Sequence, residues 1–94
     1  MIGDKIRELR ESENILLRQL AAQLDMYTAL LSKMERGDRF FRKKNILSLS
    51  EIFYLPEKEL LTIWLANKVL HNIHDEEYQI EGLELALTNL SQNA

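Results

Sequence analysis

Apolar residues recur along this chain every three or four positions, as on one face of a helix, rather than in the alternation of a half-buried strand. The spacing predicts helices over about residues 2–13, 17–24, 28–36, 43–54, 57–71 and 76–91. Residues 35–39 form one break, in which Gly37 suits a left-handed helix cap. Leu55-Pro56 forms a second, because proline is tolerated in the first turn of a helix. Gly82 weakens the last predicted helix, and the whole pattern predicts an all-α fold.

The composition is that of one small globular domain. The chain has 94 residues, of which 46% are apolar and 29% charged, and it contains no cysteine. The lack of cysteine excludes a disulfide scaffold and a thiolate metal site, and it fits a reducing cytoplasm. There is no run of about 18 apolar residues to span a membrane, and the charged N-terminus is unlike a signal peptide. We therefore expect a cytoplasmic protein.

The net charge of −3 conceals two halves of opposite sign. Residues 1–45 hold ten Lys and Arg against seven Asp and Glu, a balance of +3, whereas residues 46–94 hold two against eight, a balance of −6. This asymmetry favours a basic working surface and an acidic remainder that is held away from a polyanion. From charge alone, chance patterning of solvated faces is an equal alternative.

The stretch from Leu16 to Gly37 combines two helical segments with a short turn. Leu20 and Ala21 lie on the inner face of the first segment, and the small Ala21 lets the second segment approach closely. The corner between the segments is filled by three apolar residues, Leu24, Met26 and Leu31. These features predict a helix-turn-helix, whose second helix projects as a rigid rod.

The chain resembles the phage repressor, Cro and restriction–modification controller family of helix-turn-helix proteins (XRE-type regulators). The resemblance covers roughly residues 2–66 and rests on Arg10, Leu20-Ala21, Leu24, Leu31-Ser32 and Glu35-Arg36-Gly37. It implies a five-helix repressor-like domain, a recognition helix in the major groove of DNA and, as usual in the family, a two-fold dimer. We expect this domain at residues 1–70. Residues 71–94 then form an additional C-terminal helix, either part of the same domain or a dimerisation element.

The start of the second helix departs from the family pattern. Leu16 and Leu17 stand where a Ser-Gln pair normally opens that helix and its glutamine holds a phosphate. The phosphate contact is therefore lost here or taken over by Arg18 or Gln19.

Two further departures lie before the expected recognition helix. Asp25 stands where the turn usually has glycine, and aspartate tolerates the left-handed conformation better than most residues. Tyr27 stands at the N-cap, where it cannot cap, so either Thr28 takes over or the cap is absent at a cost of about 1 kcal/mol.

Four residues at the start of the expected recognition helix are the candidate base contacts: Thr28, Ala29, Ser32 and Lys33. Lys33 can bond guanine O6 and N7, while the hydroxyls of Thr28 and Ser32 can bond either base type. The methyl group of Ala29 can meet a thymine methyl. The alternative is that these are small solvated positions.

The segment from Arg36 to Lys44 is the best candidate for binding phosphate. Its cations are Arg36, Arg39, Arg42, Lys43 and Lys44, and Asp38 is its only acid. In the family this loop runs beside the DNA backbone, where contacts fix the register without reading bases. Phe40 and Phe41 interleave with the charges. Because duplex DNA offers no splayed base to stack on, we expect both to anchor the loop in the core.

Arg10 and Glu35 have a structural role in the family, where the matching residues pair across the first and third helices. A guanidinium fork on a carboxylate is a directional clamp. The alternative is two unrelated surface charges.

The segment 57–71 is apolar nearly all round, although a surface helix in a monomer needs only one apolar stripe. We expect the excess to form a dimer interface with Leu61, Trp64 and Leu65, in which Trp64 is the anchor. The alternative is that the sixth helix covers the excess within one chain.

No metal site, cofactor site or enzyme activity is expected. His71 and His74 stand near Asp75, Glu76 and Glu77, but a zinc site needs three or four converging ligands and a second shell, so a solvated helix end is favoured. The chain also lacks a glycine-rich phosphate loop and a nucleophile motif.

The sequence thus predicts a dimeric, nucleoid-associated regulator that binds a palindromic site on double-stranded DNA, as a repressor or a restriction–modification controller. The alternative is an antitoxin-like interaction module, whose later helices bind a protein partner. The acidic second half and the missing glutamine at Leu17 support that alternative.

Overall fold

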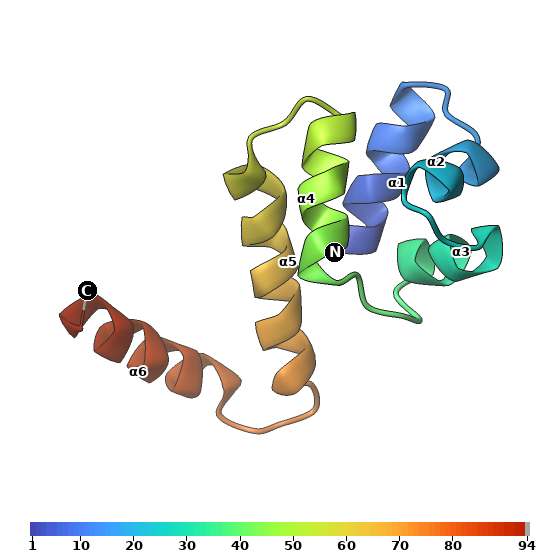
Figure 1. Ribbon diagram of the computed structural model, residues 1–94. Coiled ribbons are helices and arrows are strands. Elements are labelled where there is room, and N and C mark those ends of the chain that lie inside the picture. Colours follow the sequence, from blue (N-terminus) through green and yellow to red (C-terminus); the bar gives the residue numbers. More distant parts are fainter. Residues whose placement is uncertain (94) are drawn as a thin grey trace.

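The computed structural model describes residues 1–93 and is all-helical over that range, which confirms the predicted all-α class. The six helices are α1 (Ile2–Ser12), α2 (Leu17–Gln23), α3 (Thr28–Arg36), α4 (Lys43–Ile52), α5 (Glu57–Asn72) and α6 (Gln79–Gln92). Helices α1 to α5 gather around one core, whereas α6 extends away from the end of α5 (Figure 1). No helix in residues 1–93 is long and apolar enough to cross a membrane.

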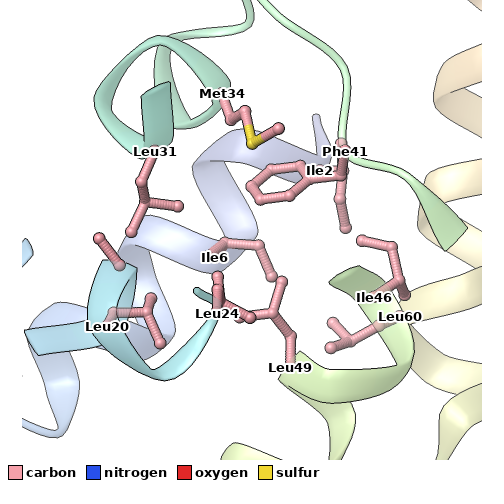
Figure 2. Packing of buried hydrophobic residues seen from close by; sticks show 11 residues of the cluster. Ile2, Ile6, Leu20, Leu24, Leu31, Met34, Phe41, Ile46, Leu49 and Leu60 are labelled. Carbon is pink, nitrogen blue, oxygen red and sulfur yellow. The ribbon is translucent and has the colours of Figure 1, made fainter. Parts of the chain in front are cut away.

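Helices α1 to α5 all contribute buried side chains to the core, and Figure 2 shows how these side chains pack together. The fully buried aliphatic side chains are Ile6 of α1, Leu20 of α2, Leu31 of α3, Ile46 and Leu49 of α4, and Leu60 of α5. Helix α3 packs on both α1 and α2, and α5 packs on α1 and α4. Because these contacts share one core, α3 is fixed relative to the rest of the bundle.

Helices α1 to α5 begin at their predicted residues, and the larger differences lie at the end of α4 and the start of α6. Helix α4 ends at Ile52 rather than 54, and α6 begins at Gln79 rather than 76. Tyr54, Asp75 and Tyr78 have φ values of 55°, 64° and 62°, in the left-handed region that a right-handed helix excludes. These three exposed residues set the two boundaries through backbone geometry, which the apolar spacing does not report.

The two breaks beside α3 have the predicted backbone. Gly37 adopts φ 85° and ends α3, with the N–H of Asp38 donating to the carbonyl of Lys33 at 2.9 Å. Asp25 adopts φ 55° in the turn between α2 and α3. Aspartate therefore holds the left-handed conformation in this turn, which it tolerates better than most residues.

The expected boundary between residues 70 and 71 falls in the last turn of α5, which continues to Asn72. The C-terminal half of α5 is tied to the start of α1, because the N–H of Ile2 donates to Asn67 Oδ1 at 3.1 Å. Residues 73–78 then lead to α6, in which no residue is buried.

Candidate nucleic-acid interface

Helix α3 has one face in the core and the other in solvent. Leu31, Met34 and Glu35 are buried on its inner side. Of the four candidate base contacts, Thr28, Ala29 and Lys33 are exposed and Ser32 is half-buried. The structure thus brings all four to the accessible side of a helix that is fixed by its packing.

Arg10 and Glu35 are brought together as a two-pronged ion pair between α1 and α3. Arg10 Nε donates to Glu35 Oε2 at 2.8 Å, and Nη2 donates to Oε1 at 3.0 Å. Nη1 donates to the carbonyl of Ile15 at 3.1 Å, which ties the α1–α2 connection to the same pair. The Glu35 side chain is only 4% exposed, and its hydrogen bond raises the pKa of Arg10 above the ordinary value. The pair therefore holds α3 by a directional, charged contact in addition to its apolar packing.

The starts of α2 and α3 are capped differently. Helix α3 begins at Thr28 without a side-chain cap, so Thr28 does not take over from Tyr27. In α2, Gln19 Oε1 accepts the N–H of Leu16 at 2.8 Å. That bond uses the carbonyl oxygen of Gln19 and leaves its amide nitrogen, beside the exposed Arg18, available to a phosphate.

The cations of residues 36–44 are all exposed. The loop between α3 and α4 is anchored through Phe41 and Trp64. Phe41 is 3% exposed in the core, and its carbonyl accepts the indole N–H of Trp64 at 2.8 Å. The expectation that Phe40 also anchors the loop in the core is wrong. Phe40 is 56% exposed, and its ring lies edge-on to that of His71 with centroids 4.6 Å apart. An extended loop turns successive side chains to opposite sides, so only one of two adjacent rings reaches the core.

A groove of about 550 Å³ lies between α3 and the start of α4. Its apolar lining includes Leu30 and Met34 of α3, and its basic lining is formed by Arg39, Arg42 and Lys44. Asp25 is the one acid among its lining residues. Arg36 lies outside the groove, with Nε 3.3 Å from Asp38 Oδ2. Three of the five predicted phosphate-binding cations of this segment therefore converge on one concave surface beside the exposed side of α3.

The helix N-termini divide the molecule into two kinds of surface. The first turns of α2, α3 and α4 contain no acid, and α4 begins with Lys43 and Lys44. The first turns of α1, α5 and α6 do contain acids. Acids stabilise a helix N-terminus and cations oppose its dipole, by about 0.3–1 kcal/mol each. The arrangement in α2 to α4 therefore disfavours stability of the free chain and favours an external anion.

Sequence reasoning missed Asn45, which is 7% exposed and positions the start of α4. Its Oδ1 accepts the N–H of Arg42 at 2.9 Å, so the loop and the helix are joined where the cations begin. A polar residue three positions after a helix start is the pattern of a reciprocal cap, and that pattern could have identified it.

The three predicted interface residues of α5 lie in different environments. Leu61 and Trp64 are partly buried against the core, whereas Leu65 is 54% exposed. Trp64 also carries the ammonium of Lys68 over its ring, 4.5 Å from the centroid. Helix α6 does not cover the outer side of α5, because Val69 and Leu70 stay 43% and 45% exposed.

Within residues 1–93, no three His, Asp or Glu side chains are placed to share a metal ion.

Comparison of the chain with protein-family models, with curated proteins and with solved structures finds no match.

Proposed function

We propose that this protein is a sequence-specific regulator that binds double-stranded DNA as a homodimer, with α2 and α3 as a helix-turn-helix of the phage repressor and Cro type. Helix α3 enters the major groove, where Thr28, Ala29, Ser32 and Lys33 meet base edges. In this proposal the chain acts as a repressor or a restriction–modification controller by occupying its operator.

One observation carries this proposal. The exposed side of α3 is flanked by a groove lined with Arg39, Arg42 and Lys44, and the neighbouring helix N-termini lack acids. A duplex presents regularly spaced phosphates on both sides of its major groove, so a projecting helix needs a basic rim beside it. Solvated surface residues have no reason to concentrate cations at positions where they oppose a helix dipole.

The Arg10–Glu35 pair supports the same function through rigidity. Base discrimination requires donors and acceptors to be held at fixed positions, because a loose helix could satisfy several base edges. Glu35 faces inward on α3 while Lys33 faces outward, so the clamp fixes the helix without occupying its DNA-facing side.

A second candidate function is favoured by a separate observation, the exposed apolar side chains of α6. An antitoxin-like chain would use such a helix to bind a protein partner. Residues 69–94 contain five acids and neither Lys nor Arg, so that partner would be basic.

The experiment that tests the proposed function is a binding series on an operator selected from random DNA. The selected site should be an imperfect palindrome, with half-site centres about 34 Å apart or a multiple of that distance. Lys33→Ala should relax preference at one base pair in each half-site, by about 1–3 kcal/mol. Arg42→Ala should instead weaken specific and random DNA alike, because phosphates are identical at every step.

Two results would contradict the proposal. If selection returns no enriched sequence, the chain does not read bases. If Lys33→Ala weakens binding to every sequence equally, Lys33 contacts phosphate, and α3 is placed wrongly on the DNA.

A further inference from the structure

Helix α5 carries apolar side chains on two opposite faces. Its inner face contacts the core through Leu60, Ile63 and Trp64. Its outer face carries five apolar residues at helical spacing, Leu65, Ala66, Val69, Leu70 and Ile73. All but Ile73 are exposed, and Ile73 is half-buried. An ordinary surface helix has a polar outer face, so this second stripe is in excess of what the chain's own core requires.

Helix α6 carries a matching stripe. Ile80, Leu83, Leu87 and Leu90 follow one another at spacings of three and four, which places them along one side of the helix. Ile80, Leu87 and Leu90 are each about two-thirds exposed, at 67%, 64% and 70%. The stripe rises about 15 Å along its axis and that of α5 about 12 Å, so the two have similar lengths.

The corner between α5 and α6 keeps these two stripes apart within one chain (Figure 1). Asp75 and Tyr78 are left-handed, and Gln79 Nε2 donates to the carbonyl of Ile73 at 2.8 Å. The hydrogen bond joins the first residue of α6 to the residue that follows α5. It fixes the direction in which α6 leaves, away from the outer face of α5.

The exposed area has the size of the apolar part of a protein interface. Complete burial of an aliphatic side chain removes about 60–120 Å² of apolar surface from water. Without the small Ala66, the two stripes hold eight such side chains, four on each. Because these side chains are on average about half exposed, they offer on the order of 250–500 Å² of apolar area per chain. A stable interface buries about 800 Å² per partner, of which somewhat more than half is apolar, so the two stripes match its apolar part.

Charge favours packing α6 on α5 over packing two α6 helices in parallel. Residues 73–93 hold five acids without a Lys or Arg, and Glu81 and Glu84 lie in the first half of α6. Two α6 helices packed side by side in parallel would bring these acids together. Helix α5 contains Lys58 and Lys68 as well as Glu57 and Glu59, so it accepts an acidic helix without net repulsion.

We propose that two copies of this chain dimerise by exchanging α6, with the α6 stripe of each copy packed on the outer face of α5 in the other. Each copy gives and receives the same surfaces, so the arrangement closes with two-fold symmetry and leaves neither stripe exposed. The inference rests on the homodimer of the proposed function, and it places the interface on the outer face of α5 and on α6.

A matched pair of variants tests the stripe. Leu87 and Leu85 are almost equally exposed, at 64% and 65%, but Leu85 lies on the opposite side of α6. Light scattering of the wild-type protein at micromolar concentration should give twice the 11.1 kDa chain mass. Leu87→Glu should halve the measured mass, and Leu85→Glu should leave it unchanged. A monomeric wild type, or equal effects of the two variants, would overturn the proposal.

Cysteine crosslinking tests the exchange, because the natural chain has no cysteine that could interfere. A mixture of Val69→Cys and Leu87→Cys chains, treated with a short bis-maleimide, should give a covalent dimer that contains one chain of each kind. In a chain carrying both changes, a product of monomer mass would show that α6 folds back on its own α5. A product from Leu87→Cys alone, without the mixed product, would show α6 packed on α6. Either result overturns the exchange.

The two proposals fail in different ways. If the Val69→Cys and Leu87→Cys chains form the mixed crosslink but the wild type selects no DNA sequence, the exchange stands and the proposed function fails. If the wild type selects a palindrome and the Leu87→Glu variant remains a dimer in light scattering, the function stands and the exchange fails.

Discussion

Gly3 of α1 lies directly against the backbone of Glu35 near the end of α3. A Cβ at position 3 would be 2.5 Å from the carbonyl oxygen of Glu35 and 2.6 Å from that of Met34. No real Cβ sits so close to backbone oxygens, so only glycine allows α1 to approach α3 this closely. The Arg10–Glu35 pair lies between the same two helices, and both features fix the position of α3.

We expect Gly3→Ala to destabilise the protein by about 1–3 kcal/mol or more, because α1 must move away from α3. Gly82→Ala is the matched control, since Gly82 is the fourth residue of α6 and a Cβ there meets no atom within 4 Å. That change should stabilise the helix by about 0.5–1 kcal/mol. Urea unfolding followed by circular dichroism measures both. A neutral Gly3→Ala would mean that α1 and α3 are farther apart in solution.

Arg10 and Glu35 should show strong energetic coupling. Arg10→Ala leaves a carboxylate that is 4% exposed without its cation, and removal of one member of a buried pair costs about 3–5 kcal/mol. In a double-mutant cycle with Glu35→Ala, the interaction energy should be on the order of 1 kcal/mol or more. A value near zero would show that the pair contributes nothing beyond its two separate side chains.

The same pair should be insensitive to moderately alkaline pH. Pairing with Glu35 raises the pKa of Arg10 above its ordinary value. A group whose pKa is raised on folding stabilises the protein fully below its unfolded pKa, and this contribution is lost only as the pH rises through the higher folded value. The coupling energy should therefore be the same at about pH 7 and about pH 9. A marked decrease over that interval would contradict the assignment of a charged arginine pair.

Much of the fold could be predicted because the apolar spacing and the special residues of the chain agree. In residues 2–37, Leu20 and Leu31 mark the inner faces of two helices, and Gly37 ends the second with the left-handed backbone that glycine favours. The approach of Arg10 to Glu35 followed from the family resemblance, since no spacing rule connects residues 25 positions apart. Within the candidate site, the exposure of the cations is a property that solvated charges share in most proteins.

The parts that could not be predicted depend on contacts between distant segments. Phe40 and Phe41 are the same residue type at adjacent positions, yet the ring of Phe41 packs in the core, where Trp64 donates to its carbonyl, and the ring of Phe40 lies against His71. The position of α6 depends on Asp75 and Tyr78, which are not residues that apolar periodicity can place. Sequence pattern reports which faces are apolar, but not which of several apolar faces will meet.

Trp64 should link the stability of the core to the binding of DNA. Trp64→Phe keeps an aromatic ring but removes the N–H that holds the carbonyl of Phe41 at 2.8 Å. We expect the free energy of unfolding to fall by about 1–3 kcal/mol, because one carbonyl loses its donor and a smaller ring fills the site. The loop with Arg39 and Arg42 should become less ordered. The affinity for any DNA sequence should therefore decrease, by at most about tenfold.

Phe40→Ala is the control for this experiment, since that ring is 56% exposed and does not hold the loop in the core. It should leave the unfolding free energy nearly unchanged, within about 0.5 kcal/mol. Circular dichroism is the appropriate measurement, because Trp64 is the one tryptophan of the chain. Equal stability of the Trp64→Phe variant and the wild type would show that the indole hydrogen bond does not anchor the loop.

Lys44 should weaken the free protein slightly while strengthening its complex with DNA. Lys44 is the second residue of α4 and lines the groove beside α3. Lys58 is the second residue of α5 and lies outside that groove, so it is a control with the same place in a helix dipole. Because a cation in the first turn opposes the dipole, Lys44→Ala and Lys58→Ala should each be neutral or stabilising, by at most about 1 kcal/mol.

The effects of these two substitutions on DNA binding should differ. Each lost phosphate contact lowers the slope of log affinity against log salt by about 0.9, so Lys44→Ala should show that decrease and Lys58→Ala should keep the wild-type slope. Binding to random DNA at several salt concentrations measures it, and an unchanged slope for Lys44→Ala would show that the groove between α3 and α4 is not where the phosphates lie.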